Sequence, residues 1–273
     1  MDNFVHKNFD ESVNVTKTNP LKEFGAYILG IIALLGIIYA IATFSVEIAI
    51  KFVDEETEKK LWNSIYSDEF EESKLSPKLQ KTQNYIQSLL DKIPKDDVPK
   101  FDYKIILQDS KEMNALAMPS GKIVIFTGLL NSIKSENGLV FILGHELGHF
   151  ANKDHLRGLG RSLVISLILI PFVTDSEISG ITSSIGGTYD NYFSRKQETK
   201  ADDHGLDALQ KLYGHVGGAT EFFEYMNKKN GESSIEGYFS THPVSQDRIS
   251  HLQKIIKSKN FKSLETTPLK KDF

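Results

Sequence analysis

The chain has 273 residues, of which 40% are hydrophobic and 25% charged, so it can bury the core of one sizeable globular domain and still carry appendages. Its formal net charge of −4 gives no electrostatic basis for a nucleic-acid partner. Because the sequence contains no cysteine, disulfides and thiolate metal sites are excluded, and any zinc ion must be held by histidine and carboxylate side chains.

The N-terminal part of the chain divides into a polar and an apolar stretch. Residues 1–23 are polar and mixed in charge, and they predict a tail without packed structure. Residues 27–46 carry no charge, and a helix of this length spans about 30 Å, the hydrocarbon thickness of a bilayer. A buried core helix and a signal peptide cleaved after the small residues Ala40 and Ala42 are the alternatives. We expect an uncleaved transmembrane anchor over residues 24–47, with an orientation that the flanking lysines determine only weakly.

Residues 52–258 are expected to form the folded domain, and residues 259–273 a polar C-terminal tail. Two amphipathic helices open this domain. The first begins in the acidic stretch after Val53, and the second begins at Ser76-Pro77, a helix cap followed by a proline in the first turn. Covering the domain is their expected role.

Three β-like runs follow at residues 103–107, 115–118 and 122–127, with a turn at Pro119–Gly121. They predict a small antiparallel sheet directly before the central motif of the chain. An edge strand of such a sheet can bind an extended peptide through main-chain contacts, although an ordinary hairpin has the same pattern. We assign the candidate substrate edge to Asn114, Ala115, Leu116 and Ala117.

The central motif is an H-E-x-x-H pattern formed by His145, Glu146 and His149. Positions four apart share one face of an α-helix, so both imidazoles can bind a single metal ion. Glu146 is displaced from that face, where it can reach a water on the metal and act as the general base. The motif therefore predicts metal-assisted hydrolysis.

The helix that carries this motif is expected over residues 135–154, with Ser135 as its N-cap. Residues 139–143 are apolar on every side, which predicts that the helix is buried. Gly144 and Gly148 lower the helix propensity, each by about 1 kcal/mol relative to alanine. In return they leave room for another backbone to pass close to the metal.

A zinc ion with two histidine ligands from one helix needs a third protein ligand, with water in the fourth position. Glu198 and Asp202 share one face of a downstream helix, and we assign Glu198 as this third ligand. Asp202, one turn further on, can orient a ligand histidine through a hydrogen bond. His242 precedes a proline and can donate to the oxyanion of a tetrahedral intermediate. We group Arg248, six residues later, with Asp202 as support behind the ligands.

Two further stretches have a structural interpretation only. Residues 163–173 form a short apolar run, expected to be a core or membrane-facing helix, and residues 180–187 are expected to form a loop. The remaining histidines in the second half of the chain lack a comparable setting, and we interpret them as surface or core residues. These are His155, His204, His215 and His251.

Four motifs in a fixed order carry a resemblance to a known family: H-E-L-G-H at 145–149, Ser194 to Asp202, Thr241-His242-Pro243 with Arg248, and the strand-turn-strand at 114–130. They resemble the integral-membrane and periplasmic zinc metallopeptidases that include the CAAX prenyl protease, HtpX and the mitochondrial inner-membrane stress protease. The resemblance covers about residues 52–250. It implies a mainly helical α+β fold of the gluzincin type, one catalytic zinc ion per chain and hydrolysis of peptide bonds.

Transferred position by position, the resemblance assigns His145, His149 and Glu198 as zinc ligands. It likewise implies that Glu146 is the catalytic base and that Asp202 is the acid behind the ligands. It assigns the role of transition-state histidine to His242.

The resulting hypothesis is a membrane-anchored zinc endopeptidase that hydrolyses unfolded or damaged polypeptides in protein quality control. We expect a single-pass protein of the bacterial inner membrane, in contact with lipid through residues 27–46, with its catalytic domain on the periplasmic side. The alternative is a non-catalytic chaperone or assembly factor with a structural zinc site. A latent enzyme is a further alternative, its cleft closed by His242 as a fourth ligand or by the helices at 54–93.

Overall fold

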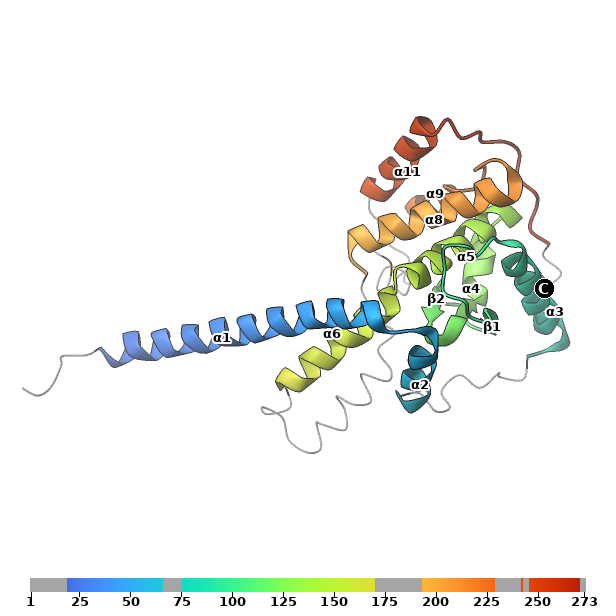
Figure 1. Cartoon of the computed structure of the whole chain (residues 1–273). Coiled ribbons are helices and arrows are strands. Elements are labelled where there is room, and N and C mark those ends of the chain that lie inside the picture. Colours follow the sequence, from blue (N-terminus) through green and yellow to red (C-terminus); the bar gives the residue numbers. More distant parts are fainter. Residues whose placement is uncertain (1–18, 66–74, 170–192, 229–241, 243–245, 271–273) are drawn as a thin grey trace, which may run out of the picture.

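The computed structural model describes residues 19–65, 75–169, 193–228, 242 and 246–270. Helices make up most of this part of the chain, and a three-stranded sheet lies beside the motif helix (Figure 1). The predicted α+β, mainly helical fold with one small sheet is therefore confirmed.

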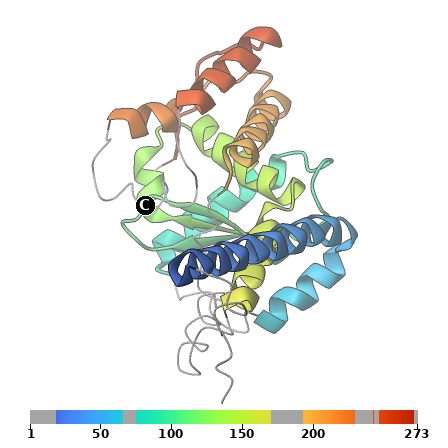
Figure 2. The same cartoon turned by 90° about the vertical axis from the view of Figure 1, so that its left-hand side faces the viewer.

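The most apolar element is helix α1 (Pro20–Ala49), which projects away from the rest of the described structure (Figures 1 and 2). Asn19 caps the helix by accepting hydrogen bonds from two amides of its first turn. Large apolar side chains are exposed along nearly its whole length. Within the described residues, the segment Pro20–Phe52 is the one helix long and apolar enough to cross a membrane. This fits a membrane protein, and residues 1–18 of the predicted tail lie outside the described residues.

After a 3₁₀ turn at Ile50–Phe52, helices α2 (Glu55–Ile65) and α3 (Pro77–Lys92) begin as their sequences predict. Acidic side chains occupy the first turn of α2, where they complement the partial positive charge of the helix N-terminus. Ser76 caps α3 by accepting a hydrogen bond from the amide of Leu79. One face of α3 is buried against the core, so α3 covers the domain as expected.

The sheet consists of β1 (Lys104–Gln108), β2 (Ala115–Met118) and β3 (Lys122–Phe126), in the order β1-β3-β2. The turn Pro119–Gly121 joins β2 to β3 as an antiparallel pair. Strand β1 instead pairs with β3 in parallel, so the prediction of a purely antiparallel sheet is wrong for this pair. The cause is the link at 109–114, which carries the chain past the central strand, and the strand pattern alone does not reveal which strand is central.

The two edges of the sheet differ. On the β1 edge, two glutamines of α3 bind the strand: Gln87 accepts from the amide of Ile105 at 2.8 Å, and Gln83 accepts from the amide of Leu107 at 2.9 Å. Gln87 also donates to the carbonyl of Tyr103 at 3.0 Å. Side chains of α3 therefore bind two amides and one carbonyl on the free edge of β1, where another strand would pair, and β2 forms the opposite edge of the sheet.

Most of the remaining helices bury apolar side chains in one core that they share with α3 and the sheet. Ser135 caps α5 as predicted, and every α5 residue from Asn137 to Phe150 is buried. In chain order the helices are α4 (Thr127–Ser132), α5 (Glu136–Ala151), α6 (Asp154–Leu169), α8 (Arg195–Tyr213), α9 (Glu221–Lys228) and α11 (Gln246–Ser258).

The backbone predicted to pass close to the motif glycines is that of α8. A Cβ added at Gly144 would lie 3.0 Å from the Cα of Gly205, and one added at Gly148 would lie 2.8 Å from the Cα of Ala201. Both distances are shorter than an ordinary van der Waals contact, so only glycine allows this approach. The prediction is confirmed, and the close approach brings the two site-bearing helices together.

The predicted C-terminal tail at 259–273 is described as far as residue 270. The chain beyond α11 returns to the start of α5, where the amide of Glu136 donates to the carbonyl of Thr267 and the amide of Leu269 to that of Lys134. The side chain of Leu269 is buried there. Residues 180–187, predicted as a loop, lie outside the described residues.

Candidate metal centre

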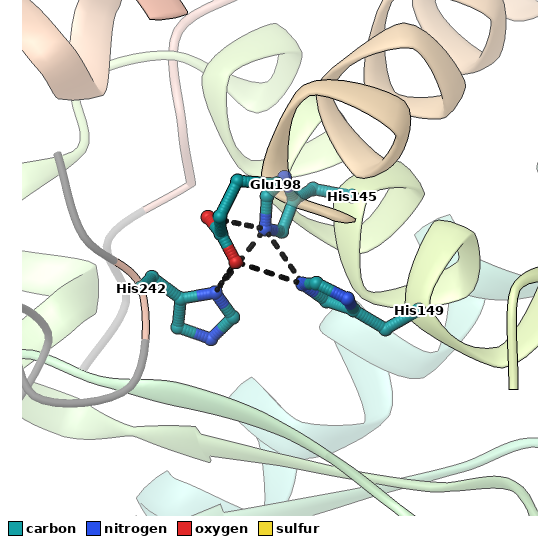
Figure 3. Close-up of side chains that lie close together, drawn as sticks. All are labelled: His145, His149, Glu198 and His242. Atoms are coloured by element: carbon teal, nitrogen blue, oxygen red, sulfur yellow. Dashed lines mark hydrogen bonds and ion pairs between the residues drawn. The ribbon is translucent and has the colours of Figure 1, made fainter. Parts of the chain in front are cut away.

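Four buried side chains converge between α5 and α8: His145 and His149 from α5, Glu198 from α8, and His242 (Figure 3). One nitrogen or oxygen atom of each lies within 4.8 Å of the corresponding atoms of the other three. The two Nε2 atoms of the histidines on α5 are 3.1 Å apart, and that of His149 is 3.4 Å from Oε1 of Glu198. The Nδ1 of His242 is 3.1 Å from the same oxygen.

The protonation of the two α5 histidines makes this cluster a metal site in chemical terms. The Nδ1 of His145 faces Asp202 at 2.9 Å, and the Nδ1 of His149 faces Asp154 at 3.0 Å. Because a carboxylate only accepts, each Nδ1 carries a proton, so each ring in its neutral form presents the lone pair of its Nε2 atom to the centre. Two such lone pairs facing each other beside a carboxylate repel unless a cation lies between them.

The spacing of the donor atoms suits zinc. Ligands about 2.0–2.1 Å from a tetrahedral zinc ion are roughly 3.3 Å from one another. The two histidine Nε2 atoms are 3.1 Å apart, and the Glu198 carboxylate lies 3.4 Å from that of His149 through Oε1 and 3.7 Å from that of His145 through Oε2. Histidine and carboxylate are zinc ligands, and in a sequence without cysteine they are the available ones. The residues present therefore fit a zinc ion.

A buried ion pair lies behind two of the ligands. Arg248, 1% exposed, donates to both oxygens of Asp202 at 2.6 and 2.8 Å and contacts Glu198 at 2.5 Å. Burial alone would raise the pKa of Asp202, but the charge and hydrogen bonds of Arg248 and the hydrogen bond from His145 hold that pKa below its usual value. Asp202 therefore stays ionised and keeps the Nδ1 proton on His145.

Sequence reasoning did not identify the residues behind His149. Asp154, at the start of α6, faces this histidine with Oδ2 and accepts from the Nε2 of Gln197 with Oδ1 at 2.7 Å. Gln197 also completes the capping box of α8 with Ser194, directly before Glu198. The ring of Phe193 stacks on His149 with 4.0 Å between centroids. The one available signal was an aspartate five residues after the motif, and its role depends on the turn between α5 and α6.

The charges of the cluster shift the pKa values of its members. Burial lowers the pKa of His145. For His149 burial acts in the same direction, but hydrogen bonds to Asp154 and Glu198 outweigh it and raise the pKa to about 10. For Glu198 burial would raise the pKa, and the charges of His242 and Arg248 hold it well below its usual value. Without metal the cluster therefore holds a proton on His149, which zinc must displace.

The other residues singled out in the sequence lie outside the cluster of four metal-site side chains. Asn114, Ala115 and Leu116 of the proposed substrate edge are buried, and Ala117 is partly exposed. His155, interpreted as surface or core, is buried and faces Glu58 at 2.9 Å, outside the cluster of four. His251, interpreted in the same way, is partly exposed and faces Asp203 at 2.8 Å.

Comparisons with known proteins match the part of the chain that contains this centre. Residues 80–256 match the family model described as Peptidase family M48, and they contain the three residues assigned as metal ligands together with Glu146 and His242. The chain is 30% identical over 163 residues to "Metalloendopeptidase OMA1, mitochondrial" of Danio rerio, covering 54% of this chain and 34% of that protein. It is also 30% identical over 179 residues to the protein of the same name from Homo sapiens, covering 59% of this chain and 34% of that protein.

A bacterial protein gives a similar match. "Metalloprotease LoiP" of Escherichia coli (strain K12) is 30% identical over 159 residues, covering 56% of this chain and 61% of that protein. The chain thus spans about a third of the length of these OMA1 proteins and less than two thirds of LoiP. The family match covers well over half of the 273 residues and confirms the resemblance seen in the motifs: the chain belongs to peptidase family M48.

Proposed function

We propose that this chain is a membrane-anchored zinc endopeptidase with Glu146 as its general base. The observation that carries the proposal is the position of this carboxylate in the metal centre. It is fully buried on the ligand helix, and both of its oxygens lack a hydrogen-bond partner among the described residues. A buried carboxylate without a partner is costly, and a water molecule at the metal would satisfy it.

The proposed reaction divides its tasks among few residues. Zinc bound at His145, His149 and Glu198 would polarise the scissile carbonyl and lower the pKa of a coordinated water to about 7. Glu146 takes the proton from the attacking water and later transfers it to the leaving amine. The Nε2 of His242 lies 3.8 Å from Oε1 of Glu146, and the doubly protonated ring would donate from this nitrogen to the oxyanion of the tetrahedral intermediate.

The proposed substrates are extended polypeptides bound along β2. Because side chains of α3 bind the β1 edge, β2 is the edge through which strand addition is supported. Such binding recognises main-chain groups and tolerates many side chains, which suits unfolded or damaged proteins. The names of two relatives, a metalloendopeptidase and a metalloprotease, support polypeptides as the substrate class.

The proposed setting is a lipid bilayer crossed by α1. Its apolar side chains are exposed, and lipid is the environment that favours such a surface. We assign the catalytic domain to the periplasmic side of a bacterial inner membrane, the setting that the motif resemblance favours.

The test compares the full chain in detergent with its Glu146→Gln variant, measuring casein hydrolysis and zinc content on the same samples. We expect about one zinc ion per chain in both proteins, and a loss of hydrolysis by several orders of magnitude in the variant alone. Glu56→Gln is the matched control, because this glutamate is exposed and forms a local ion pair with Lys60 at 2.7 Å, one helical turn away.

Each other outcome decides against part of the proposal. Zinc without hydrolysis in either protein would favour a latent enzyme or a non-catalytic chaperone with a structural zinc site. Equal hydrolysis in both proteins would remove Glu146 from the mechanism. Absence of zinc from the wild-type protein would contradict the ligand assignment.

A further inference from the structure

The end of the membrane helix touches the turn that follows the second zinc-binding histidine. The Nε of Arg157 on α6 donates to both carboxylate oxygens of Glu47 on α1, at 2.9 and 3.1 Å. The Nη1 of the same guanidinium donates to the carbonyl of Asn152 and lies 3.3 Å from Oδ1 of Asp154. Asp154 in turn holds the Nδ1 of His149 at 3.0 Å, so three consecutive polar contacts join α1 to a metal ligand.

Two further contacts fix the same junction. The ammonium group of Lys153, in the turn between α5 and α6, donates to the carbonyls of Ile50 and Val53 just after α1. Val46 packs so closely on Gly160 of α6 that a Cβ at this glycine would lie 2.3 Å from the valine Cγ1. Figure 1 shows α6 running alongside α1 from this point. The end of α1 is therefore held against the turn by packing as well as by charge.

Glu47 is the first charged residue after the apolar run at 27–46, so it lies at the boundary of the expected membrane span. Its side chain is 43% exposed and that of Arg157 is 25% exposed. Exposed ion pairs contribute little to stability, but a partly buried pair beside lipid is screened less. The effect expected of this pair is therefore on the geometry of Asp154 rather than on the stability of the fold.

Arg157 stands between two carboxylates. Glu47 accepts from the Nε atom of the guanidinium, and Asp154 makes the longer contact of 3.3 Å with Nη1. Asp154 therefore remains a strong acceptor for His149 and Gln197. Without Glu47 the full charge of Arg157 would act on Asp154 and draw it from His149. Such partners behind a metal ligand fix the orientation and basicity of its ring.

We propose that Glu47 and Arg157 are positioning residues of the metal centre, through which the membrane anchor helps to set the orientation of His149. The inference rests on the metal centre of the proposed function and adds to it a dependence on α1. Neither residue touches the metal or the substrate.

The test measures zinc affinity in the full chain in detergent, by competition with a chromophoric chelator, for the wild type and for Glu47→Gln. Glutamine keeps the size of the side chain and removes its charge. We expect the dissociation constant for zinc to rise about 3- to 10-fold, less than the 10- to 100-fold typical of a direct partner such as Asp154. We also expect a shifted visible absorption band in the cobalt-substituted variant, because the geometry at His149 changes.

The matched control is Glu56→Gln, which removes a charge from an exposed local pair and should leave both readings at the wild-type values. Asp154→Asn is the reference for a direct partner of His149. If Asp154→Asn weakens zinc binding while Glu47→Gln does not, the inference is wrong and the ion pair only docks α1. If the wild type itself fails to bind zinc, the metal centre of the proposed function is wrong instead.

Circular dichroism of the metal-free proteins checks that each variant is folded. If Glu47→Gln does not fold, Arg157→Lys replaces it, because a lysine keeps the charge but loses the planar fork that reaches Glu47 and Asn152 together. The same rise in the dissociation constant is expected, and wild-type affinity in folded Arg157→Lys would overturn the inference.

Discussion

Gly148 of α5 and Ala201 of α8 approach so closely that a Cβ on the glycine would lie 2.8 Å from the alanine Cα. The same Cβ would lie 2.9 Å from the Cβ of His204. Gly148 directly precedes His149 on α5, and Ala201 lies three residues after Glu198 on α8, so the contact helps to set the distance between the two helices that carry the centre.

The variant Gly148→Ala should therefore destabilise the domain in spite of its better helix propensity. Alanine gains about 1 kcal/mol in an open helix, whereas overpacking against a fixed backbone costs about 1–3 kcal/mol. We expect a lower midpoint of thermal unfolding and a weaker zinc affinity, because α8 must move away from α5. Gly36→Ala is the control, since a Cβ there meets nothing within 4 Å, and an equal change in both variants would contradict the argument.

Asp202→Asn should weaken zinc binding about 10- to 100-fold with little change in fold. The neutral side-chain amide of the asparagine is a weaker acceptor for the Nδ1 proton of His145 than a carboxylate, and Arg248 loses a charged partner. Chelator competition measures the effect. The neighbouring Asp203→Asn removes only a partly exposed contact to His251 and should bind zinc like the wild type. Equal affinity in the two variants would show that Asp202 does not support a ligand.

His242→Ala separates the two roles that its position allows. As the donor to the oxyanion, its loss should lower kcat/KM about 10²- to 10³-fold while zinc remains near one per chain. Its Nδ1 also lies 3.3 Å from the Nε2 of His145, within the reach of a fourth donor. A loss of zinc from His242→Ala would make it a ligand and favour the latent alternative. His251→Ala, outside the cluster, serves as the control.

Zinc affinity should rise with pH well above the usual histidine range. The raised pKa of His149, about 10, means that the metal-free site is protonated at pH 7 to 9, while zinc needs the neutral ring. Each unit of pH should then lower the apparent dissociation constant about tenfold up to pH 9, whereas an ordinary histidine would level off above pH 7.

Chelator competition at pH 6.5, 7.5 and 8.5 gives this slope. In Asp154→Asn the main partner that raises the pKa of His149 is gone, so the slope between pH 7.5 and 8.5 should flatten. A wild-type affinity that is constant over this interval would contradict the protonated metal-free site.

Much of the metal centre could be predicted because it depends on local chemistry. Ser135 marks the start of α5 by accepting a hydrogen bond from the amide three residues further on, a capping pattern that the sequence displays directly. The i, i+4 spacing of His145 and His149 fixes their common face, and two glycines on α5 predict the close neighbour. The length and composition of the apolar run before residue 47 predict a helix that stays outside the core of the folded domain.

Three features could not be predicted because they depend on tertiary packing. They are the direction of β1, the contact of Asp154 with His149 and the pairing of Arg157. The parallel register of β1 depends on which strand is central, a choice that strand propensity does not contain. Asp154 reaches His149 because Lys153 adopts φ 53 in the turn between them, a conformation rare outside glycine and asparagine.

By itself the sequence determined the fold class and the family of the chain and predicted the metal-binding face, because caps, periodicity and motif spacing act over a few residues. Only the tertiary structure decided which groups support the ligands. By charge alone any of the 36 acidic residues could pair with Arg157, and the packing of α1 on α6 selects Glu47, 110 residues away. Such pairs depend on positions defined to within an ångström, and contacts across the whole fold set those positions.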